Sequence, residues 1–434
     1  MNESGPSRAP LASPLSRRRL LRLGAASLTA VSAGAALSAC GWSGQNADRS
    51  STLRVQNWGS ADEAKVYDAT FAAFRRQHPG LKVSNNVVPV TLWGDYVSKL
   101  AVQMASGHSP DLLNLGMEGT RLSVERSMLA PLGSRVKDSP AAFREHISEL
   151  PKALLDAYTV DGTLYAVPNG WQTMMVYCNP RIFRARGVEL PAADWTWEDF
   201  LSTARRLTGG GVMGFGLPWG FFQLHPWWLT NGGYPVTDDY RKPNLSDPRV
   251  VEAVAFVRDL VQKYKVSPDP TSVDVYSQFA AGKFAMIGAG RWPLPGWSAA
   301  SFTDYTAHPW PKRVSHTTVV GGSGWALSTR AVKPDIAWAA IDYLLLPSSV
   351  ARLTEVGQAL PVYPGIGDDT GDKAADRAFD VLFRQLDDSR PVAAPAFYDT
   401  LESVAMRYLQ QIVSGRLDPA KGLRAADAEI KEAL

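Results

Sequence analysis

Strand-like and helix-like segments alternate along this chain from residue 53 onward. Residues 53–58 alternate apolar and polar side chains as a strand does, and apolar residues then recur at helical spacing up to the His-Pro-Gly stop at 78–80. Residues 81–90 are strand-like again, a second helix ends before Gly107, and 111–115 form a short apolar strand. This β-α-β-α-β order predicts an α/β fold whose sheet is mostly parallel, with helices on both faces.

Helix and strand signals continue to the end of the chain. Aspartate followed by proline begins helices at 247 and 418, residues 284–287 are typical of a buried strand, and 337–346 of an apolar helix. A length of 434 residues predicts two to three structural units.

Composition and charge exclude several classes of protein. Hydrophobic residues make up 45% of the chain and charged residues 20%, which excludes a largely disordered chain. Two cysteines cannot form a disulfide scaffold. Five arginines against one acid within residues 1–39 account for the excess positive charge. The remainder, with 40 basic and 41 acidic residues, has no basic field for nucleic acid.

Residues 1–39 have the pattern of a signal peptide. Arginines cluster at 17–19 and 22, an apolar run rich in Ala, Gly and Ser follows over 23–39, and small residues precede Cys40. The apolar run is short for a membrane helix and contains several Gly and Ser residues, which favours a signal peptide. The alternative interpretation is an N-terminal transmembrane anchor. The arginine cluster resembles a twin-arginine signal, and the general secretion route is the alternative to that.

Residues 37–40, Leu-Ser-Ala-Cys, resemble a bacterial lipobox. The resemblance implies cleavage before Cys40, lipid attachment to that residue, and anchoring on the outer face of the bacterial cytoplasmic membrane. Residues 40–51 then form a lipidated, flexible tether. Cys178 becomes the only thiol of the mature chain, and its apolar neighbours predict a buried, unreactive side chain.

Motifs for catalysis and cofactor binding are missing from the sequence. It contains no phosphate-binding loop, no zinc-protease motif, no nucleophile elbow and no dinucleotide fingerprint. The six histidines are scattered without helical pairing. We therefore expect no catalytic residue, no cofactor and no metal ion.

Tryptophan is the unusual feature of the mature chain. All 14 tryptophans follow Cys40, and several stand beside Gly, Pro or Asn, where loops are expected. A flat ring next to such backbone suits stacking on the C–H face of a sugar, while nearby polar groups pair with hydroxyls. Core packing is the alternative for each ring. It is the expectation for Trp195 and Trp197, since Thr196 is placed to cap a helix.

The order of short motifs resembles the family 1 extracellular solute-binding proteins of ABC importers, the maltose and oligosaccharide-binding type. The resemblance covers nearly the whole mature chain, although Cys178 stands where the family often carries Tyr or Asn. The motifs that carry it are 58–59 with Asp62 and Glu63, 71–74, 78–80, 109–113, 165–168, 177–180, 195–200, 279–286, 321–328 and 360–364.

The resemblance implies an α/β, two-lobed periplasmic binding protein-like (type II) fold with hinge-crossing segments near 167–172, 319–323 and 359–362. It places 52–167 and 323–358 in the N-terminal lobe, and 168–322 and 359–434 in the C-terminal lobe. A solute binds in the cleft, the lobes close on it, and the permease subunits of an ABC importer receive it. The resemblance thus implies a binding protein and not an enzyme.

Candidate ligand-binding residues combine a position at a strand end or crossing segment with a side chain that stacks or hydrogen-bonds. An internal ion pair is the alternative for Arg291, and core packing is the alternative for two further stacking candidates, Phe397 and Tyr398. The candidates are Trp58, Asp62, Glu63, Asn114, Glu118, Trp171, Gln172, Trp227, Trp228, Asn231, Arg291, Trp292, Trp325 and Tyr363.

The sequence therefore predicts a monomeric lipoprotein that captures a sugar or oligosaccharide and delivers it to an ABC importer, with no nucleic-acid partner. One alternative is an exported glycoside hydrolase with paired carboxylates. Another is a binder of a different solute, such as a polyamine, a peptide or a glycerophosphodiester. The mixture of Glu63, Glu118 and Arg291 with many tryptophans favours a neutral sugar.

Overall fold

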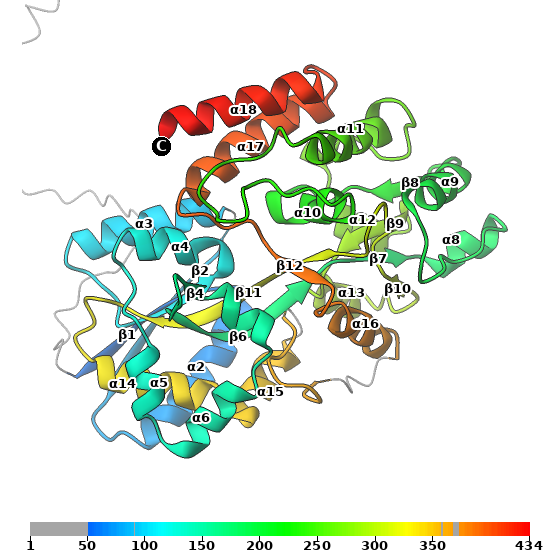
Figure 1. Cartoon of the computed structure of the whole chain (residues 1–434). Helices are drawn as coiled ribbons and strands as arrows, with labels where there is room; N and C mark the ends of the chain where they lie inside the picture. The colour runs from blue at the N-terminus through cyan, green and yellow to red at the C-terminus, as the bar shows by residue number, and fades with distance from the viewer. Residues whose placement is uncertain (1–50, 91, 357–358, 368–372) are drawn as a thin grey trace, which may run out of the picture. The chain divides into compact units, whose positions relative to one another are not determined.

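Two β-sheets with their surrounding helices make up the part of the chain that the computed structural model describes, residues 51–90, 92–356, 359–367 and 373–434 (Figure 1). The predicted signal peptide, the lipobox with Cys40, and the tether up to residue 50 lie outside the described residues.

The first sheet is built from six strands: β1 (Thr52–Trp58), β2 (Lys82–Val88), β3 (Leu112–Gly116), β6 (Ala166–Thr173), β11 (Thr318–Leu327) and β12 (Ser389–Pro391). Their order is β12-β11-β3-β1-β2, with β6 also paired to β11. β1 is parallel to β2 and β3, as the alternating pattern predicts. β11 is antiparallel to β3 and β6, so the sheet is mixed.

Helices cover both faces of the first sheet (Figure 1). α2 (Ala61–Arg76), α14 (Pro334–Leu344) and α15 (Pro347–Glu355) lie on one face, and α3 (Trp93–Ala105) and α4 (Met117–Glu125) lie on the other. Leu53, Val55, Leu112 and Leu113 form the buried centre between them. Three short helices and a hairpin follow: α5 (Gly133–Asp138), α6 (Ala141–Ser148), α7 (Lys152–Ala157), β4 (Thr159–Val160) and β5 (Thr163–Leu164).

The second sheet has the order β10-β7-β9-β8, formed by β7 (Met175–Cys178), β8 (Met213–Gly216), β9 (Phe284–Ala289) and β10 (Thr306–His308). Cys178 is fully buried on β7, as its neighbours predict, and burial raises the pKa of its thiol well above the ordinary value. The helices on this side are α8 (Pro180–Ala185), α9 (Trp197–Leu207), α10 (Phe221–Thr230), α11 (Pro248–Gln262), a 3-10 turn η1 (Pro270–Ser272), α12 (Val275–Ala280), α13 (Leu294–Ala299) and α16 (Lys373–Arg384).

Two C-terminal helices pack together, and the first of them touches both halves of the described chain. α17 (Tyr398–Val413) and α18 (Pro419–Ala433) pack on one another beside α11, and α17 also packs against α3 and α4 (Figure 1). An ion pair between Arg126 and Asp399, 2.6 Å long, joins the end of α4 to the start of α17.

Three connections pass between the two sheets, and they lie side by side. β6 leads through Met174 into β7, the chain returns from β10 to β11, and the segment around Leu360 leads from α15 toward α16. β6 pairs with β11, and the backbone N–H of Trp171 donates to the carbonyl oxygen of Leu360 at 3.1 Å, with the reverse bond at 2.9 Å. These are the segments that the resemblance marks as hinge crossings.

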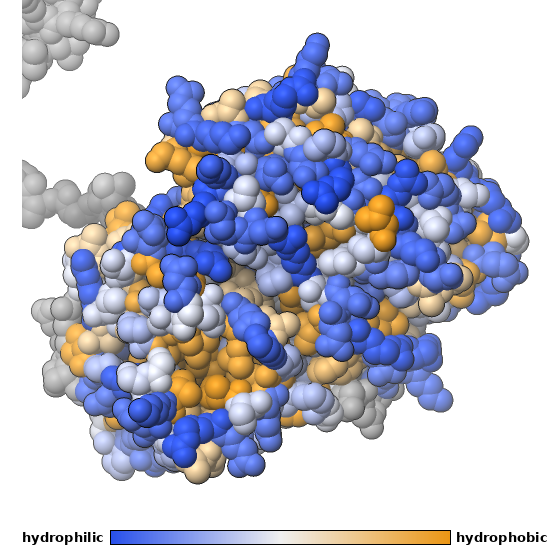
Figure 2. Space-filling model, viewed as in Figure 1, coloured by the Kyte–Doolittle hydropathy of each residue, from blue (hydrophilic) through white to orange (hydrophobic). Residues whose placement is uncertain are grey.

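Most of the face in Figure 2 is hydrophilic, and hydrophobic residues gather in the lower half of the view, where β6 and α5 lie in Figure 1. Among the described residues no single helix is long and apolar enough to cross a membrane. α14 and α15 together meet that test of length and composition, with a bend of 70° between them.

Candidate functional site

A cavity of about 580 Å³ is lined by residues of the first sheet, of segments that flank both sheets, and of the connections between them. On the side of the first sheet, its wall is formed by the end of β1, the starts of α3 and α4, and α17. The segment before α10 and the turn after β9 come from the side of the second sheet, and β6 and β11 supply the crossing segments. The volume is within the range usual for sites that hold small molecules.

Five indole rings line this cavity: Trp58, Trp93, Trp171, Trp219 and Trp292. Trp58 meets Trp93 edge-on, with ring centroids 5.1 Å apart, and Trp292 meets Phe222 in the same way at 6.2 Å. Trp171 is buried, and the other four rings are partly exposed. Aromatic surface from both sheets is therefore available to one bound molecule.

Glycines let two of these rings approach the backbone. A Cβ atom at Gly116 would lie 2.6 Å from the Trp93 ring and 2.7 Å from the Glu118 carboxylate. At Gly290 it would meet the ring of Trp292 and the amide oxygen of Gln172. Any larger residue at these two positions would displace the cavity wall.

Hydrogen-bonding groups stand between the rings. The Gln172 side-chain oxygen accepts from the backbone N–H of Arg291 at 2.9 Å, and the Ser323 hydroxyl donates to Asn169 at 2.6 Å. Glu63 accepts from the backbone N–H of Ser60 at 2.7 Å as part of the capping box that begins α2. The indole N–H of Trp58 is buried and finds no hydrogen-bond partner among the described residues, so it is a donor that a bound molecule could satisfy.

Two buried glutamates belong to the same wall. Burial raises the pKa of Glu118 to about 8 and that of Glu402 to about 7. Glu402 accepts hydrogen bonds from the Tyr398 hydroxyl at 3.2 Å and from the backbone N–H of Gly94 at 3.3 Å. None of the described residues that line the cavity is Lys, Arg or His.

Six of the candidates chosen from sequence are brought together here: Trp58, Glu63, Glu118, Trp171, Gln172 and Trp292. Tyr398 lines the cavity as well, whereas Phe397 lies outside its lining. The remaining eight candidates also lie outside it, contrary to expectation, and each has a partner or a packing role elsewhere.

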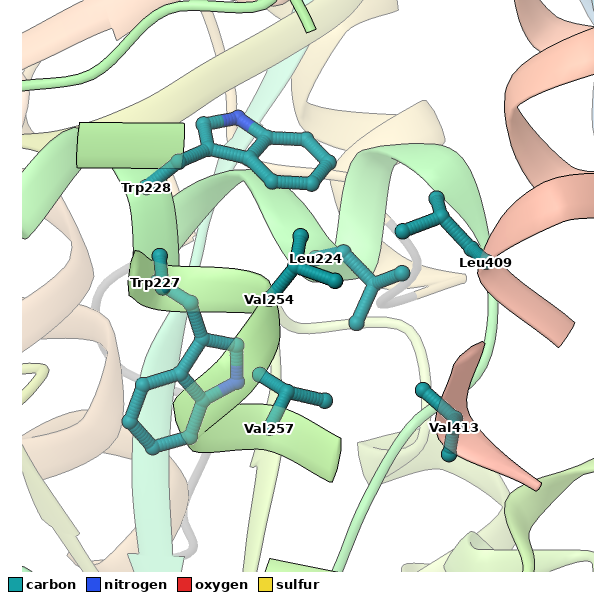
Figure 3. Close-up of a pocket in the computed structure, with 8 residues that line it drawn as sticks. Leu224, Trp227, Trp228, Val254, Val257, Leu409 and Val413 are labelled. Atoms are coloured by element: carbon teal, nitrogen blue, oxygen red, sulfur yellow. The ribbon is translucent and has the colours of Figure 1, made fainter. Parts of the chain in front are cut away.

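Trp227 and Trp228 lie in α10 and not in a loop, because the Pro226 that suggested a loop is accommodated inside the helix. Figure 3 shows both rings beside Leu224, Val254 and Val257, around an apolar void of about 10 Å³. A void of that size is at the lower limit for one water molecule. Both tryptophans are core residues.

Trp325 and three polar candidates are held inside the protein. Trp325 is a fully buried residue of β11 and packs edge-on against Tyr67, with ring centroids 5.6 Å apart. The Asn114 side-chain amide donates to the side-chain oxygen of Asn57 at 2.8 Å. The Tyr363 hydroxyl donates to the Leu345 carbonyl oxygen at 2.9 Å, and Asn231 ends α10 and donates to the Arg249 carbonyl oxygen at 2.8 Å.

The last two candidates outside the lining are charged. Arg291 is buried beside the cavity and donates to the carbonyl oxygen of Ala359 at 2.9 Å, so it ties the second sheet to a crossing segment. Asp62 is exposed and pairs with Lys65 at 2.8 Å.

Sequence reasoning missed Trp93, Trp219 and Glu402. The first two follow β2 and β8, so the criterion of strand ends would have found them had it been applied to every strand. Glu402 is in the middle of α17, and no sequence motif near it indicates a site residue. Only the packing of α17 on α3 brings it to the cavity. Among the described residues no group of three or more His, Cys, Asp or Glu is arranged to hold a metal ion.

An α/β body with two sheets, three adjacent connections and an aromatic cavity lined from both sheets has the construction of a protein that binds a small molecule. The chain belongs to the bacterial extracellular solute-binding protein family, whose model matches residues 69–380. This confirms the family predicted from the sequence motifs, and it is a family of binding proteins and not of enzymes.

Relatives and solved structures agree with that assignment. Proteins of Brucella abortus named only as binding proteins are 24% identical over 234 residues, and the chain spans about half of their length, 55%, and 52% of its own. The sn-glycerol-3-phosphate-binding periplasmic protein UgpB of Escherichia coli is 22% identical over 73% of this chain and 75% of its own length.

Two solved structures have the same fold. An ABC substrate-binding protein from Listeria monocytogenes in complex with cycloalternan is similar with a TM-score of 0.78 and 22% identity, over 88% of this chain and 98% of its own. The maltotriose-binding protein of Thermus thermophilus, bound with maltotriose, has a TM-score of 0.71 and 19% identity, over 88% and 99%. The predicted α/β periplasmic binding protein fold is thereby confirmed.

Proposed function

We propose that this protein captures a saccharide in the cavity between its two sheets and delivers it to an ABC importer. The observation that carries the proposal is the lining of the cavity: five indoles from both sheets, with amide, hydroxyl and carboxyl groups between them. Sugars present C–H faces that stack on indoles and hydroxyls that pair with such polar groups. The solved neighbour that holds maltotriose supports the same choice.

Glycerol-3-phosphate is the second candidate solute, favoured by the likeness to UgpB. A phosphate dianion needs Arg or Lys donors or a helix N-terminus without acids. The start of α10, which has no acid in its first turn, is a helix N-terminus in the lining. The described lining nevertheless has no basic residue and carries Glu63, Glu118 and Glu402. The charge of the cavity therefore disfavours this solute.

The lipid on Cys40 and the closing motion belong to the same proposal. The anchor would keep the loaded protein near the permease, and the two-sheet cavity would narrow when one solute contacts both of its walls. Replacing Cys40 by Ser should release the protein from membranes of the producing bacterium into the medium, as measured by fractionation.

Tryptophan fluorescence of the purified full chain, titrated with a panel of mono- and disaccharides and with glycerol-3-phosphate, tests the proposal. A saccharide should quench or shift the emission, and Trp292→Ala should weaken its binding at least about tenfold, or ~1.4 kcal/mol. Trp338→Phe is the matched control, because Trp338 lies outside the cavity lining and donates to Ser139 at 2.8 Å. A response to glycerol-3-phosphate alone would contradict the proposal.

A further inference from the structure

The acids of the cavity lack the counterions that buried carboxylates usually have. Glu63, Glu118 and Glu402 all line it, and none of them forms an ion pair with a described Lys, Arg or His. The carboxylate of Glu63 is engaged in the capping box of α2. Glu402 accepts from the Tyr398 hydroxyl and from the backbone N–H of Gly94 in the first turn of α3, whereas Glu118 has no comparable structural task.

Glu118 is the more isolated of the two. Its side chain is buried, with 5% of the residue exposed, and apart from its own backbone amide it has no hydrogen-bond partner among the described residues. The carboxylate and the ring of Trp93 both lie close to Gly116, because a Cβ atom there would be 2.7 Å from the first and 2.6 Å from the second. Because Glu118 lines the cavity, a bound molecule can supply the partner that the described side chains do not.

Glu402 stands close enough to Glu118 for the two charges to repel each other. It is buried to a similar degree, with 6% exposed, and its carboxylate accepts from Gly94, the residue after Trp93. The groups that face the two acids from the packed elements are Asp95, Tyr158 and Tyr398, all acidic or neutral. No described cation offsets them.

A cationic group in the cavity would remove this imbalance. Two carboxylates and the face of an indole are the surroundings in which proteins hold an ammonium ion. Burial raises the pKa of Glu118 to about 8 and that of Glu402 to about 7, and a cation bound between them would favour the charged form of both.

We propose that the solute is a saccharide bearing an amino group, whose ammonium lies between Glu118, Glu402 and the ring of Trp93. The inference rests on the proposed function, since it takes the rest of the cavity to hold a sugar. It narrows the solute from sugars in general to amino sugars.

Saccharides that share one skeleton and differ at one substituent test this. Cellobiose, N,N′-diacetylchitobiose and the β-1,4 dimer of glucosamine carry hydroxyl, acetamide and ammonium groups, and glucose with glucosamine and galactose with galactosamine extend the comparison. Calorimetric titration of the full chain at neutral pH should show the ammonium member of a pair binding at least about tenfold more tightly than the hydroxyl member.

Three variants separate charge from shape. E118Q and E402Q should each weaken the ammonium ligand about tenfold more than they weaken the hydroxyl ligand, because the amide keeps the shape and removes the charge. D62N is the control, since Asp62 is an exposed acid outside the lining and its loss should change nothing. Binding of the ammonium ligand should also release on the order of one proton, measured from the enthalpy in buffers of different ionisation heat.

The outcomes distinguish the two proposals. If hydroxyl members bind as tightly as ammonium members and the glutamine variants make no difference between them, the amino-sugar inference fails while the sugar-binding function stands. If no saccharide binds, or if only spermidine does, both fail.

Discussion

The glutamates of the cavity show that burial can decide the behaviour of a side chain more than its type. Glu63 and Glu118 were chosen from sequence as hydrogen-bonding residues, and both line the cavity. The structure adds that Glu118 and Glu402 are buried with no ion-pair partner in the described part of the chain, and burial raises the pKa of each. Desolvation is the first cause in both cases, because a carboxylate loses more from leaving water than a carboxylic acid does.

The stability of the empty protein should therefore fall as the pH rises. The pKa of Glu118 is about 8 in the folded chain against an ordinary value of 4.5, so between these values the folded state binds more protons than the unfolded one. The stabilisation by the protonated Glu118 is complete below pH 4.5 and is lost as the pH rises through about 8. Glu118→Gln should flatten this decline and raise the free energy of unfolding at mildly alkaline pH by about 1–3 kcal/mol.

Urea unfolding at acidic and mildly alkaline pH, without ligand, measures this difference. Asp62→Asn is the control and should keep the wild-type decline, since Asp62 is exposed. Parallel pH profiles for wild type and Glu118→Gln would contradict the burial argument.

At the scale of the element, two helices begin with the same motif in different surroundings. Ser60 with Glu63 starts α2, and Thr196 with Asp199 starts α9, each as a complete capping box. Hydrogen bonds from Thr196 lower the pKa of Asp199, which is exposed, whereas burial raises the pKa of Glu63. The motif determines the helix start, and the position in the fold determines whether its acid takes part in the site.

Removing either cap should cost a similar amount of stability but have different effects on binding. Ser60→Ala and Thr196→Ala should each lower the free energy of unfolding by about 1 kcal/mol, because each leaves backbone donors at the helix start unsatisfied. Only Ser60→Ala should weaken binding of the solute. It removes the bonds that the Ser60 hydroxyl makes with Glu63 at the cavity wall, while the bond from the backbone N–H of residue 60 remains. Thermal unfolding and calorimetric titration of the pair check this, and equal losses of affinity would contradict it.

At the scale of the whole molecule, the three adjacent connections and the segment from α16 to β12 link the two sheets covalently. A solute that contacts cavity walls from both sheets adds a non-covalent link. It should stabilise the protein by about 2.7 kcal/mol at a hundredfold excess over the dissociation constant. It should also reduce the radius of gyration, because the narrowed state holds more contacts.

Thermal unfolding and small-angle X-ray scattering, each with and without the solute, measure these two effects. Trp292→Ala should show neither at the same solute concentration, since it removes one of the contacting rings. A stabilised protein with an unchanged radius would show that the solute binds without closure.

The sequence was informative where the signal is local. The parallel strands β1, β2 and β3, the helix starts at Thr196, Asp247 and Asp418, and the buried thiol of Cys178 all follow from nearby residues. The strand β11 was marked by a motif, but its antiparallel place next to β3 depends on residues two hundred positions away.

The site was predictable only in part, because residues with similar sequence neighbours have different neighbours in the folded protein. Trp292 and Trp228 both stand beside proline or another tryptophan in the sequence. Trp292 lines the cavity because it follows the end of β9. Trp228 is buried between α10 and α11, because it lies on the inward face of α10. Glu402, in mid-helix, could not be chosen at all.

From the sequence alone come the α/β class, the family and the richness in tryptophan, since periodicity and motif order are properties of neighbouring residues. Tertiary packing alone decided which indoles face the cavity, that Arg291 is absent from its lining, and that two glutamates there have no counterion among the described residues. The physical reason is that burial and electrostatic surroundings are set by segments that meet only in the folded chain.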